Sequence, residues 1–166
     1  MVDVLGYDVG GANTKAAFIK TGNCVIQEFK TASEYFPVWK NPEKLIDVLL
    51  RLKKTVADAV TLDCMGVTMT AELSDAYRTK REGVNHILSC VAQAFPNTIV
   101  YVLDLEAKLI SMEAAKSAPL RVAAANWAAT GWLVSQYLDN CVVIDVGSTS
   151  TSIIPVIEGH ISAVGK

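Results

Sequence analysis

Residues 8–15, DVGGANTK, decide the fold of this chain, because residues 145–151, DVGSTST, repeat the same pattern near its other end. Each copy follows a short apolar run, at residues 4–7 and 141–144, and each leads into another strand-like run. This context predicts two tight strand–turn–strand hairpins with an acidic residue at the mouth. Glycine lets such a turn adopt positive φ, and successive N–H groups and small hydroxyls then point outward as donors to an anion.

The repetition turns a common turn sequence into a specific signal for phosphate. A single Asp-x-Gly turn is ordinary in any protein, and neither GxGxxG nor GxxxxGK followed by Ser or Thr occurs here. A carboxylate repels phosphate unless a cation lies between them, and Mg²⁺ typically uses one or two carboxylates with phosphate oxygens and water. We therefore expect Asp8 and Asp145 to face each other across one cleft and to bind Mg²⁺. The expected phosphate-binding residues are Gly10, Gly11, Ala12, Asn13, Thr14, Lys15, Gly147, Ser148, Thr149 and Ser150.

Hydrophobic periodicity and turn residues outline the rest of the chain. Strands are predicted at about residues 2–9, 15–20, 24–30, 61–69 and 98–103, and helices at about 42–59, 80–95 and 119–138. A loop is predicted between the third strand and the first helix. The order βββαβαβα, restarting as βββ, indicates an α/β chain with one ribonuclease-H-like lobe at residues 1–139. Residues 140–166 then form the start of a second lobe.

Three blocks, at residues 6–15, 67–75 and 125–130, resemble one branch of a known superfamily. The hairpins are similar to those of the actin, sugar-kinase and heat-shock ATPase superfamily, whose two-lobed fold clamps nucleotide phosphates between two such turns. Within it, the chain looks most like the branch related to hydantoinase A and oxoprolinase in archaea and methylotrophs. That branch includes tetrahydromethanopterin-linked C1-transfer proteins, also described as methanofuran-precursor synthases.

The resemblance implies a cleft between two lobes, and residues 1–166 account for one lobe and the start of another. We expect the second lobe to come from further sequence or from a partner chain. Apolar surface should be exposed where that lobe closes, which favours self-association, so a homodimer is a further possibility. The chain alone should be a poor catalyst.

A polar segment follows the predicted strand at residues 61–69, where ligands of α/β sheets collect. Thr68 and Thr70 are candidate substrate-binding residues, and Glu72 and Asp75 are candidate catalytic acids or bases. The alternative is that this segment caps a helix, with its acids in the first turn. The cations that follow are substrate candidates as well, although a solvated helix face is the commoner place for such a pair. They are Lys80 and Arg81.

Two further residues are predicted to be catalytic. Asn126 interrupts the apolar stripe of the predicted helix at residues 119–138, and burying its amide without a partner would cost about 1–3 kcal/mol. A satisfied core amide is one interpretation. In actin, however, the corresponding helix carries the glutamine that orders the attacking water, which implies that Asn126 faces the cleft. Lys15 can reach phosphate oxygens as a point charge, and its alternative is an exposed edge-strand lysine.

Composition narrows the class of protein. The net charge of −2 offers no basic field for nucleic acid or for an anionic membrane. The four cysteines show no CxxC spacing and lie in apolar runs, which favours buried free thiols over disulfides or a metal site. No apolar run approaches the ~18 residues of a membrane span, and the start has no basic leader. We therefore expect a cytoplasmic protein with a small-molecule substrate.

The resemblance leaves several functions open. The first is a transferase that joins an aminomethylfuran-methyl diphosphate to the phenol of γ-glutamyltyramine in methanofuran biosynthesis, with Mg²⁺ and the hairpins holding the leaving pyrophosphate. The second keeps ATP as the ligand, in a kinase or in an ATP-driven hydantoinase or oxoprolinase subunit. The third is a non-enzymatic, nucleotide-gated scaffold. Titration with ATP and with pyrophosphate would separate the first two.

Overall fold

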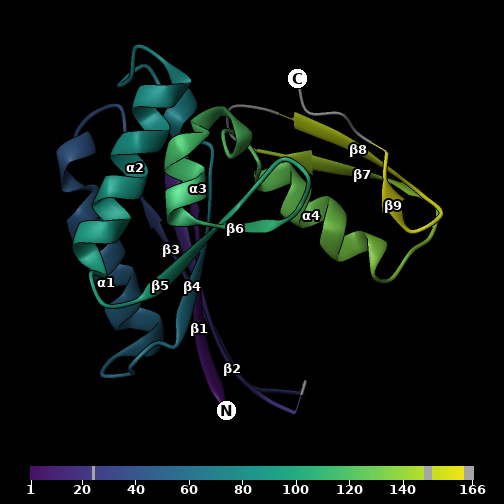
Figure 1. Ribbon diagram of the computed structural model, residues 1–166, viewed down its shortest axis with the longest axis horizontal. Coiled ribbons are helices and arrows are strands. Elements are labelled where there is room, and N and C mark those ends of the chain that lie inside the picture. The colour runs from purple at the N-terminus through teal and green to yellow at the C-terminus, as the bar shows by residue number, and fades with distance from the viewer. Residues whose placement is uncertain (24, 148–150, 163–166) are drawn as a thin grey trace.

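The computed structural model describes residues 1–23, 25–147 and 151–162, which form two sheets (Figure 1). Sheet A has six strands in the order β3-β2-β1-β4-β5-β6, and sheet B has three in the order β7-β8-β9. The strands of sheet A are β1 (Val2–Val9), β2 (Asn13–Gly22), β3 (Val25–Tyr35), β4 (Cys64–Met69), β5 (Ile99–Leu103) and β6 (Leu109–Ser111). Those of sheet B are β7 (Cys141–Val146), β8 (Thr151–Ile157) and β9 (His160–Ile161).

Helices connect the parallel strands. In sheet A, β1, β2 and β3 form an antiparallel meander, while β4 runs parallel to β1 and β5 parallel to β4. Each parallel pair needs a crossover, and helices supply it. The helices are the 3₁₀ turns η1 (Pro42–Lys44), η2 (Ala71–Leu73) and η3 (Pro119–Arg121), and the α-helices α1 (Leu45–Ala57), α2 (Lys80–Ala94), α3 (Met112–Ser117) and α4 (Asn126–Ser135).

The main core lies between one face of sheet A, the core face, and helices α1 and α2. Alternate residues of β1 point to this face, so Leu5, Tyr7 and Val9 are buried while their neighbours are not. Leu49 of α1 packs in the same core, and its carbonyl oxygen accepts a hydrogen bond of 2.6 Å from the Tyr7 hydroxyl. Burial of each large apolar side chain of this kind contributes about 1.5–3 kcal/mol. The core thereby fixes the strands that carry the first hairpin.

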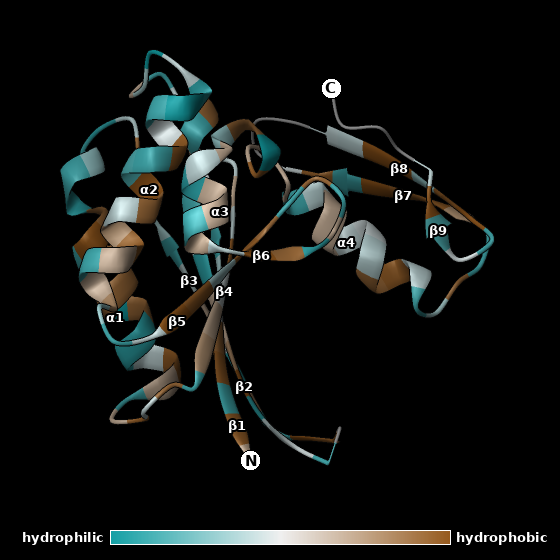
Figure 2. Ribbon diagram, in the orientation of Figure 1, coloured by the Kyte–Doolittle hydropathy of each residue, from teal (hydrophilic) through white to brown (hydrophobic). Residues whose placement is uncertain are grey.

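Helix α4 belongs to sheet B. It packs against β7, β8 and β9, and Figure 1 shows it beside that sheet, away from α1 and α2. The opposite face of sheet B carries five exposed aliphatic side chains, visible as brown stretches of β7 and β8 in Figure 2: Val142, Ile144, Val146, Ile153 and Ile157. No helix in the described parts of the chain is long and apolar enough to span a membrane.

The α/β class with its ribonuclease-H-like strand order agrees with the sequence prediction, but two predicted elements differ. The third strand extends to Tyr35, through residues that were predicted to be a loop. The predicted helix at residues 119–138 is interrupted. Its first turn is η3, Ala124 has a left-handed φ of 52°, and α4 begins only at Asn126. The predicted boundary at residue 139 follows α4 and precedes β7.

Cysteine burial differs in part from the prediction. Cys90 is buried, whereas Cys64 and Cys141 are half-buried, and all three are free thiols. Cys24 lies outside the described residues. Burial raises the pKa of the Cys90 and Cys64 thiols, and the nearby Asp63 carboxylate adds to the shift at Cys64. A raised pKa keeps these thiols protonated and weakly nucleophilic at neutral pH, so neither is a candidate nucleophile.

Candidate functional site

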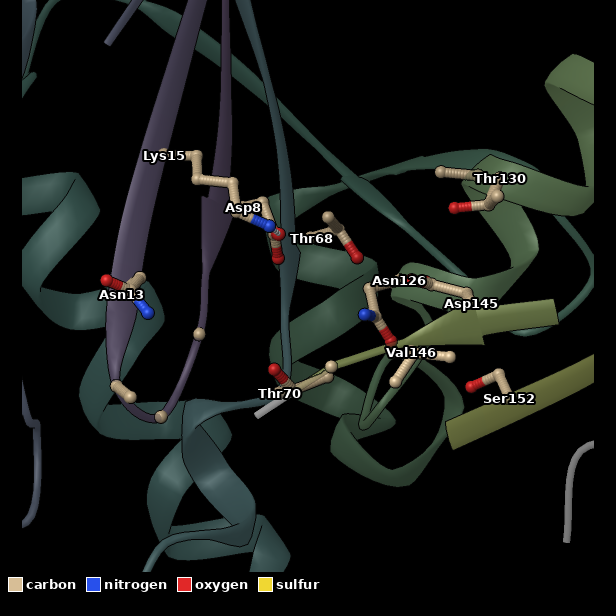
Figure 3. Close-up of a pocket in the computed structure, with 15 residues that line it drawn as sticks. Asp8, Asn13, Lys15, Thr68, Thr70, Asn126, Thr130, Asp145, Val146 and Ser152 are labelled. Atoms are coloured by element: carbon tan, nitrogen blue, oxygen red, sulfur yellow. Dashed lines mark hydrogen bonds and ion pairs between the residues drawn. The ribbon is translucent and has the colours of Figure 1, made fainter. Parts of the chain in front are cut away.

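A cavity of about 490 Å³ lies between the two hairpins (Figure 3). Asp8 and Asp145 both line it, one from each sheet. The first hairpin also contributes Gly10, Gly11, Ala12, Asn13 and Lys15, and β4 and its end contribute Thr68 and Thr70. The remaining lining residues are Asn126, Ala129 and Thr130 of α4, and Val146, Gly147 and Ser152 of the second hairpin. Residues far apart in the sequence thus form one polar cavity.

The turn of the first hairpin depends on a close backbone contact at Gly10. The Gly10 N–H donates a hydrogen bond of 3.0 Å to the Asn13 carbonyl oxygen. A Cβ atom at Gly10 would lie only 2.5 Å from that oxygen, whereas one at Gly11 would meet nothing within 4 Å. Neither glycine has a left-handed φ. The sequence interpretation of a turn with positive φ is therefore wrong at both positions, and only Gly10 needs glycine for space.

Two hydrogen bonds orient the peptide groups of this turn. The carbonyl oxygens of Gly11 and Ala12 accept from the N–H groups of Val38 and Phe36, both at 2.9 Å. These donors belong to the segment after β3 and do not line the cavity. Because the C=O and N–H of one peptide unit point in opposite directions, the N–H groups of Ala12 and Asn13 point away from that segment. The turn can thus present backbone donors to an anion in the cavity.

Asp8 lies opposite Lys15 in the β1–β2 pair, and their side chains form an ion pair of 3.2 Å. The other carboxylate oxygen of Asp8, Oδ1, is buried and has no hydrogen-bond partner among the described residues. The same is true of the Thr68 hydroxyl, which lies on the neighbouring strand directly beside Asp8. Buried polar atoms without partners are rare in proteins. Both atoms are therefore free to bind a cation or its water ligands, which fits the predicted Mg²⁺ site.

The second hairpin repeats this arrangement. Asp145 lies opposite Ser152 in the β7–β8 pair, as Asp8 lies opposite Lys15. Gly147 lines the cavity, whereas Ser148, Thr149 and Ser150 lie outside the described residues. Within the described parts of the chain, no group of three or more His, Cys, Asp or Glu side chains could hold a metal ion. Mg²⁺ does not need such a group, because one or two carboxylates with phosphate oxygens and water are its usual ligands.

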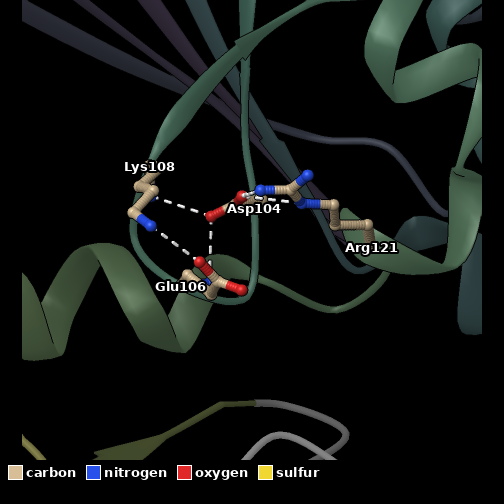
Figure 4. Close-up of polar contacts among 4 residues, drawn as sticks. All are labelled: Asp104, Glu106, Lys108 and Arg121. Carbon is tan, nitrogen blue, oxygen red and sulfur yellow. Dashed lines mark hydrogen bonds and ion pairs between the residues drawn. The ribbon is translucent and has the colours of Figure 1, made fainter.

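Asn126 occupies the first position of α4 and lies in the cavity between the hairpins (Figure 3). Two buried carboxylates fix the segment that leads to it. Glu72 accepts a hydrogen bond of 2.6 Å from the Ala124 N–H. Asp104 binds the Arg121 guanidinium at 2.8 Å and accepts N–H bonds from the turn between β5 and β6 (Figure 4). Together they hold Ala124 in its left-handed conformation and set the start of α4.

Glu72 is placed by the structure behind the cavity rather than in it. Its side chain is 2% exposed, and it does not line the cavity. Burial raises the pKa of its carboxyl group, although the Ala124 N–H bond and the nearby Lys80 oppose the shift. Glu72 therefore has a structural role through its contact with Ala124. Its predicted role as a base in the reaction has no geometric support.

Other predicted residues also lie away from the cavity. Asp75, Lys80 and Arg81 are exposed, the last two in the first turn of α2, and none lines the cavity. Thr14 is fully buried, because strand alternation turns it to the core face while Asn13 and Lys15 face the cavity side. The hydroxyl of Thr14 therefore cannot reach a phosphate in this cavity.

The burial of Glu72 gives a prediction for stability. A carboxyl group whose pKa is raised by folding contributes stability that is fully present below the unfolded value of about 4.3. That contribution is lost as the pH rises through the raised pKa. Gln at position 72 keeps the acceptor for Ala124 and has no charge to bury. We expect Glu72→Gln to gain stability relative to the parent as the pH rises from about 4 to 8.

Urea unfolding of both proteins across this range measures the effect. The exposed Glu43→Gln in η1 is the matched control, and its difference from the parent should change little with pH. A Glu72→Gln difference that stays constant over the whole range would show that ionisation of Glu72 carries no cost in the folded protein.

Four lining residues were missed by the sequence analysis: Ala129, Thr130, Val146 and Ser152. Two of these residues could have been identified from their spacing in the sequence. Thr130 follows Asn126 by four residues, so both share one face of a helix. Ser152 follows Asp145 by seven residues, the same spacing that separates Lys15 from Asp8. Comparing the two hairpins position by position would have found Ser152.

The strand order and paired hairpins define a protein of the actin-like ATPase and sugar-kinase fold. The solved Ppx/GppA phosphatase of Aquifex aeolicus matches 98% of this chain and 51% of its own, with a TM-score of 0.57 and 15% identity. A ROK family glucokinase from Streptomyces griseus, in complex with glucose and AMPPNP, matches 96% of this chain and 46% of its own. Its TM-score is 0.52 at 14% identity. These likenesses show the fold.

The chain belongs to the hydantoinase/oxoprolinase family, whose model matches residues 63–165. A curated relative from Methanocaldococcus jannaschii is 40% identical over 161 residues, which are 96% of this chain and 45% of the relative. Its name is (4-{4-[2-(gamma-L-glutamylamino)ethyl]phenoxymethyl}furan-2-yl)methanamine synthase. The chain thus spans about half the length of this relative.

Proposed function

We propose that this chain supplies the diphosphate-binding part of a transferase that makes an aryl furfuryl ether. In this reaction the phenol oxygen of γ-glutamyltyramine attacks the methylene carbon of an aminomethylfuran-methyl diphosphate. The carbon–oxygen bond to the diphosphate breaks, pyrophosphate leaves, and the phenolic proton is released to water. The product is the ether named for the Methanocaldococcus jannaschii relative, a precursor of methanofuran.

The observation that carries this proposal is the shared cavity of the two hairpins. It joins the carboxylates of Asp8 and Asp145, the Lys15 ammonium and the turn at residues 10–13. Pyrophosphate brings several negative charges, and backbone donors, a lysine and a metal held by carboxylates are the groups that bind it. The relative, at 40% identity, is named for a product that contains the corresponding ether.

Each group has a distinct part in the reaction. Asp8 and Asp145 would hold Mg²⁺, which neutralises the charge that develops on the leaving pyrophosphate. Lys15 reaches the same oxygens from the edge of the cavity, and the N–H groups of the first turn bind them directly. Asn126 lies between the hairpins, where its amide can orient the substrate at the reacting carbon. Asp8, Asp145 and Lys15 thus act on the leaving group rather than on the phenol.

A second candidate keeps ATP as the ligand, because the glucokinase of the same fold was solved with AMPPNP. Both functions use the hairpins, so only the reaction products can distinguish the transferase from the ATP-dependent enzyme. The chain would be co-expressed with the part of the Methanocaldococcus jannaschii synthase that lies outside the match, and the complex supplied with the furan diphosphate and γ-glutamyltyramine.

If the protein is the transferase, mass spectrometry should detect the ether when no ATP is present. One pyrophosphate should be released for each ether formed. The kinase or ATPase function would be established instead if the complex forms no ether from these substrates but hydrolyses ATP or transfers its phosphate to a substrate.

A further inference from the structure

One side of sheet A ends in a long strand, β3, whose outer edge pairs with no other strand in the described parts of the chain. β3 has eleven residues and contains no proline, whereas β6 at the opposite edge has only three residues. An open edge presents backbone N–H and C=O groups that can continue the ladder of hydrogen bonds into another strand. β3 is therefore the place in sheet A where a further strand can bind.

The two faces of β3 carry different side chains. Lys30 lies opposite Phe18 in the β2–β3 pair, and Phe18 is buried, so the even-numbered residues of the regular part of β3 share the core face. The odd-numbered residues point to the other face. Among them, Phe29 and Tyr35 are 60% and 68% exposed. Two large aromatic side chains thus lie in solvent beside the open edge.

The segment at residues 29–35, FKTASEY, is complementary to itself in charge when two copies pair antiparallel about Ala32. Lys30 of each copy then lies opposite Glu34 of the other copy, on the same face of the joined sheet. Opposite charges in such cross-strand positions stabilise a pair of strands. Because the arrangement is symmetric, the pair of opposite charges occurs twice.

Charge also disfavours alternative registers of the same two strands. Pairing centred on Lys30 would place the two Lys30 side chains opposite each other, and pairing centred on Thr31 would place Glu28 opposite Glu34. Like charges directly opposite each other are destabilising. A register centred on Phe29 pairs opposite charges, but it includes the irregular part of β3 that precedes Glu28. The register centred on Ala32 uses only regular strand.

The register centred on Ala32 also pairs the aromatic side chains. Phe29 of each copy lies opposite Tyr35 of the other, and aromatic pairs in these positions are stabilising. Tyr35 in turn lies opposite Asn13 in the β2–β3 pair, and Asn13 lines the cavity of the hairpins. Each end of the paired segment thus lies beside the first hairpin of one copy.

We propose that two copies of this chain form a symmetric dimer, in which the β3 strands pair antiparallel about Ala32 and join the two copies of sheet A. Within each chain, Lys30 contacts Glu28 at 2.7 Å and Glu34 contacts Arg51 at 2.6 Å. These contacts can persist in the dimer, because an ammonium group has three donors and a carboxylate accepts several hydrogen bonds. One pair of short strands is a small interface, so the dimer should dissociate in the micromolar range.

Sedimentation velocity over a range of chain concentrations measures the dimer. Lys30→Glu places two negative charges opposite each other, and Glu34→Lys places two positive charges there. Each change should weaken dimerisation at least about tenfold, while the double variant restores opposite charges and should dimerise nearly as well as the parent. Lys54→Glu on the exposed side of α1 controls for net charge and should have no effect. Thermal melting of each variant checks that it folds.

Cysteine substitution then measures the register. Ala32→Cys places two thiols on the symmetry axis, where the Cα atoms of paired strands are about 4.5–5.5 Å apart and a disulfide can form. Thr31→Cys is the matched control, because its two copies would lie about 8 Å apart, beyond the reach of a disulfide. Mild oxidation should give at least about tenfold more covalent dimer from Ala32→Cys than from Thr31→Cys or the parent.

Three results would each overturn the proposal. The first is a parent chain that sediments as a monomer at every concentration. The second is a dimer whose affinity ignores the single charge reversals, or a double variant that folds but does not recover the dimer. The third is as much covalent dimer from Thr31→Cys as from Ala32→Cys.

Discussion

Replacing Asp8 with asparagine in the assembled protein should lower kcat/KM by about 100-fold or more, which is a loss of roughly 3 kcal/mol of transition-state stabilisation. Asparagine keeps the size of the side chain but supplies no charge to a metal. The turn itself should persist, because its shape depends on the contact between Gly10 and Asn13. In the ion pair between Asp8 and Lys15 the lysine is exposed and the carboxylate half-buried, so the pair contributes little stability. The melting temperature should therefore change little.

The measurement compares kcat/KM and melting temperature for Asp8→Asn, the parent and Asp47→Asn. Asp47 is an exposed carboxylate in the first turn of α1, so its variant controls for the loss of one charge. A kcat/KM for Asp8→Asn that equals that of the control would mean that Asp8 is only a turn residue. A fall in activity matched by a large fall in melting temperature would assign it a structural role instead.

The second large effect is expected at Gly10. A methyl group there would lie 2.5 Å from the Asn13 carbonyl oxygen, a backbone atom that cannot move without opening the turn. We expect Gly10→Ala to cost about 1–3 kcal/mol of stability. It should also lower pyrophosphate affinity at least about tenfold, because the N–H groups of the turn no longer point into the cavity. Gly11→Ala is the matched control, since its Cβ meets nothing within 4 Å.

Chemical unfolding and calorimetric titration of the two alanine variants measure these effects. Gly11→Ala should unfold at nearly the same denaturant concentration as the parent. Equal stability of both variants would contradict the steric account of the turn.

The hairpins could be predicted from the sequence because local sequence patterns and the tertiary fold favour the same structure there. Strand alternation in β1, the acidic residue at its end and the repeated turn all follow from the sequence, and the predicted bounds of β1 match the structure. Alternation also gives the side of each β2 residue. Applied strictly, it places Thr14 on the core face and removes it from the phosphate-binding set.

The interruption before α4 could not be read from the sequence. The segment at residues 122–125, VAAA, has high helix propensity, and nothing local ends a helix at Ala124. The cause is distant in the chain, because Glu72 accepts the Ala124 N–H and Asp104 holds Arg121. These tertiary contacts override propensity. The same contact explains why Glu72 lies outside the cavity although its neighbour Thr70 lines it.

Asn126 lines the cavity as predicted, but from a different position in its helix. The sequence analysis placed it within a long helix, on an otherwise apolar stripe. In the structure it is the first residue of α4, and the cavity lies at that helix end. Its position depends on the Glu72 and Asp104 contacts, so the two buried carboxylates act on the cavity through the backbone.

The most direct test of a single diphosphate site shared by both hairpins is a double-mutant cycle on Asp8 and Asp145. Calorimetric titration of the chain with pyrophosphate in the presence of Mg²⁺ gives Kd for the parent, Asp8→Asn, Asp145→Asn and the double variant. If both carboxylates act on one bound metal diphosphate, each single change lowers affinity and the two effects are strongly non-additive. Purely additive effects, or no effect of one substitution, would contradict the shared site.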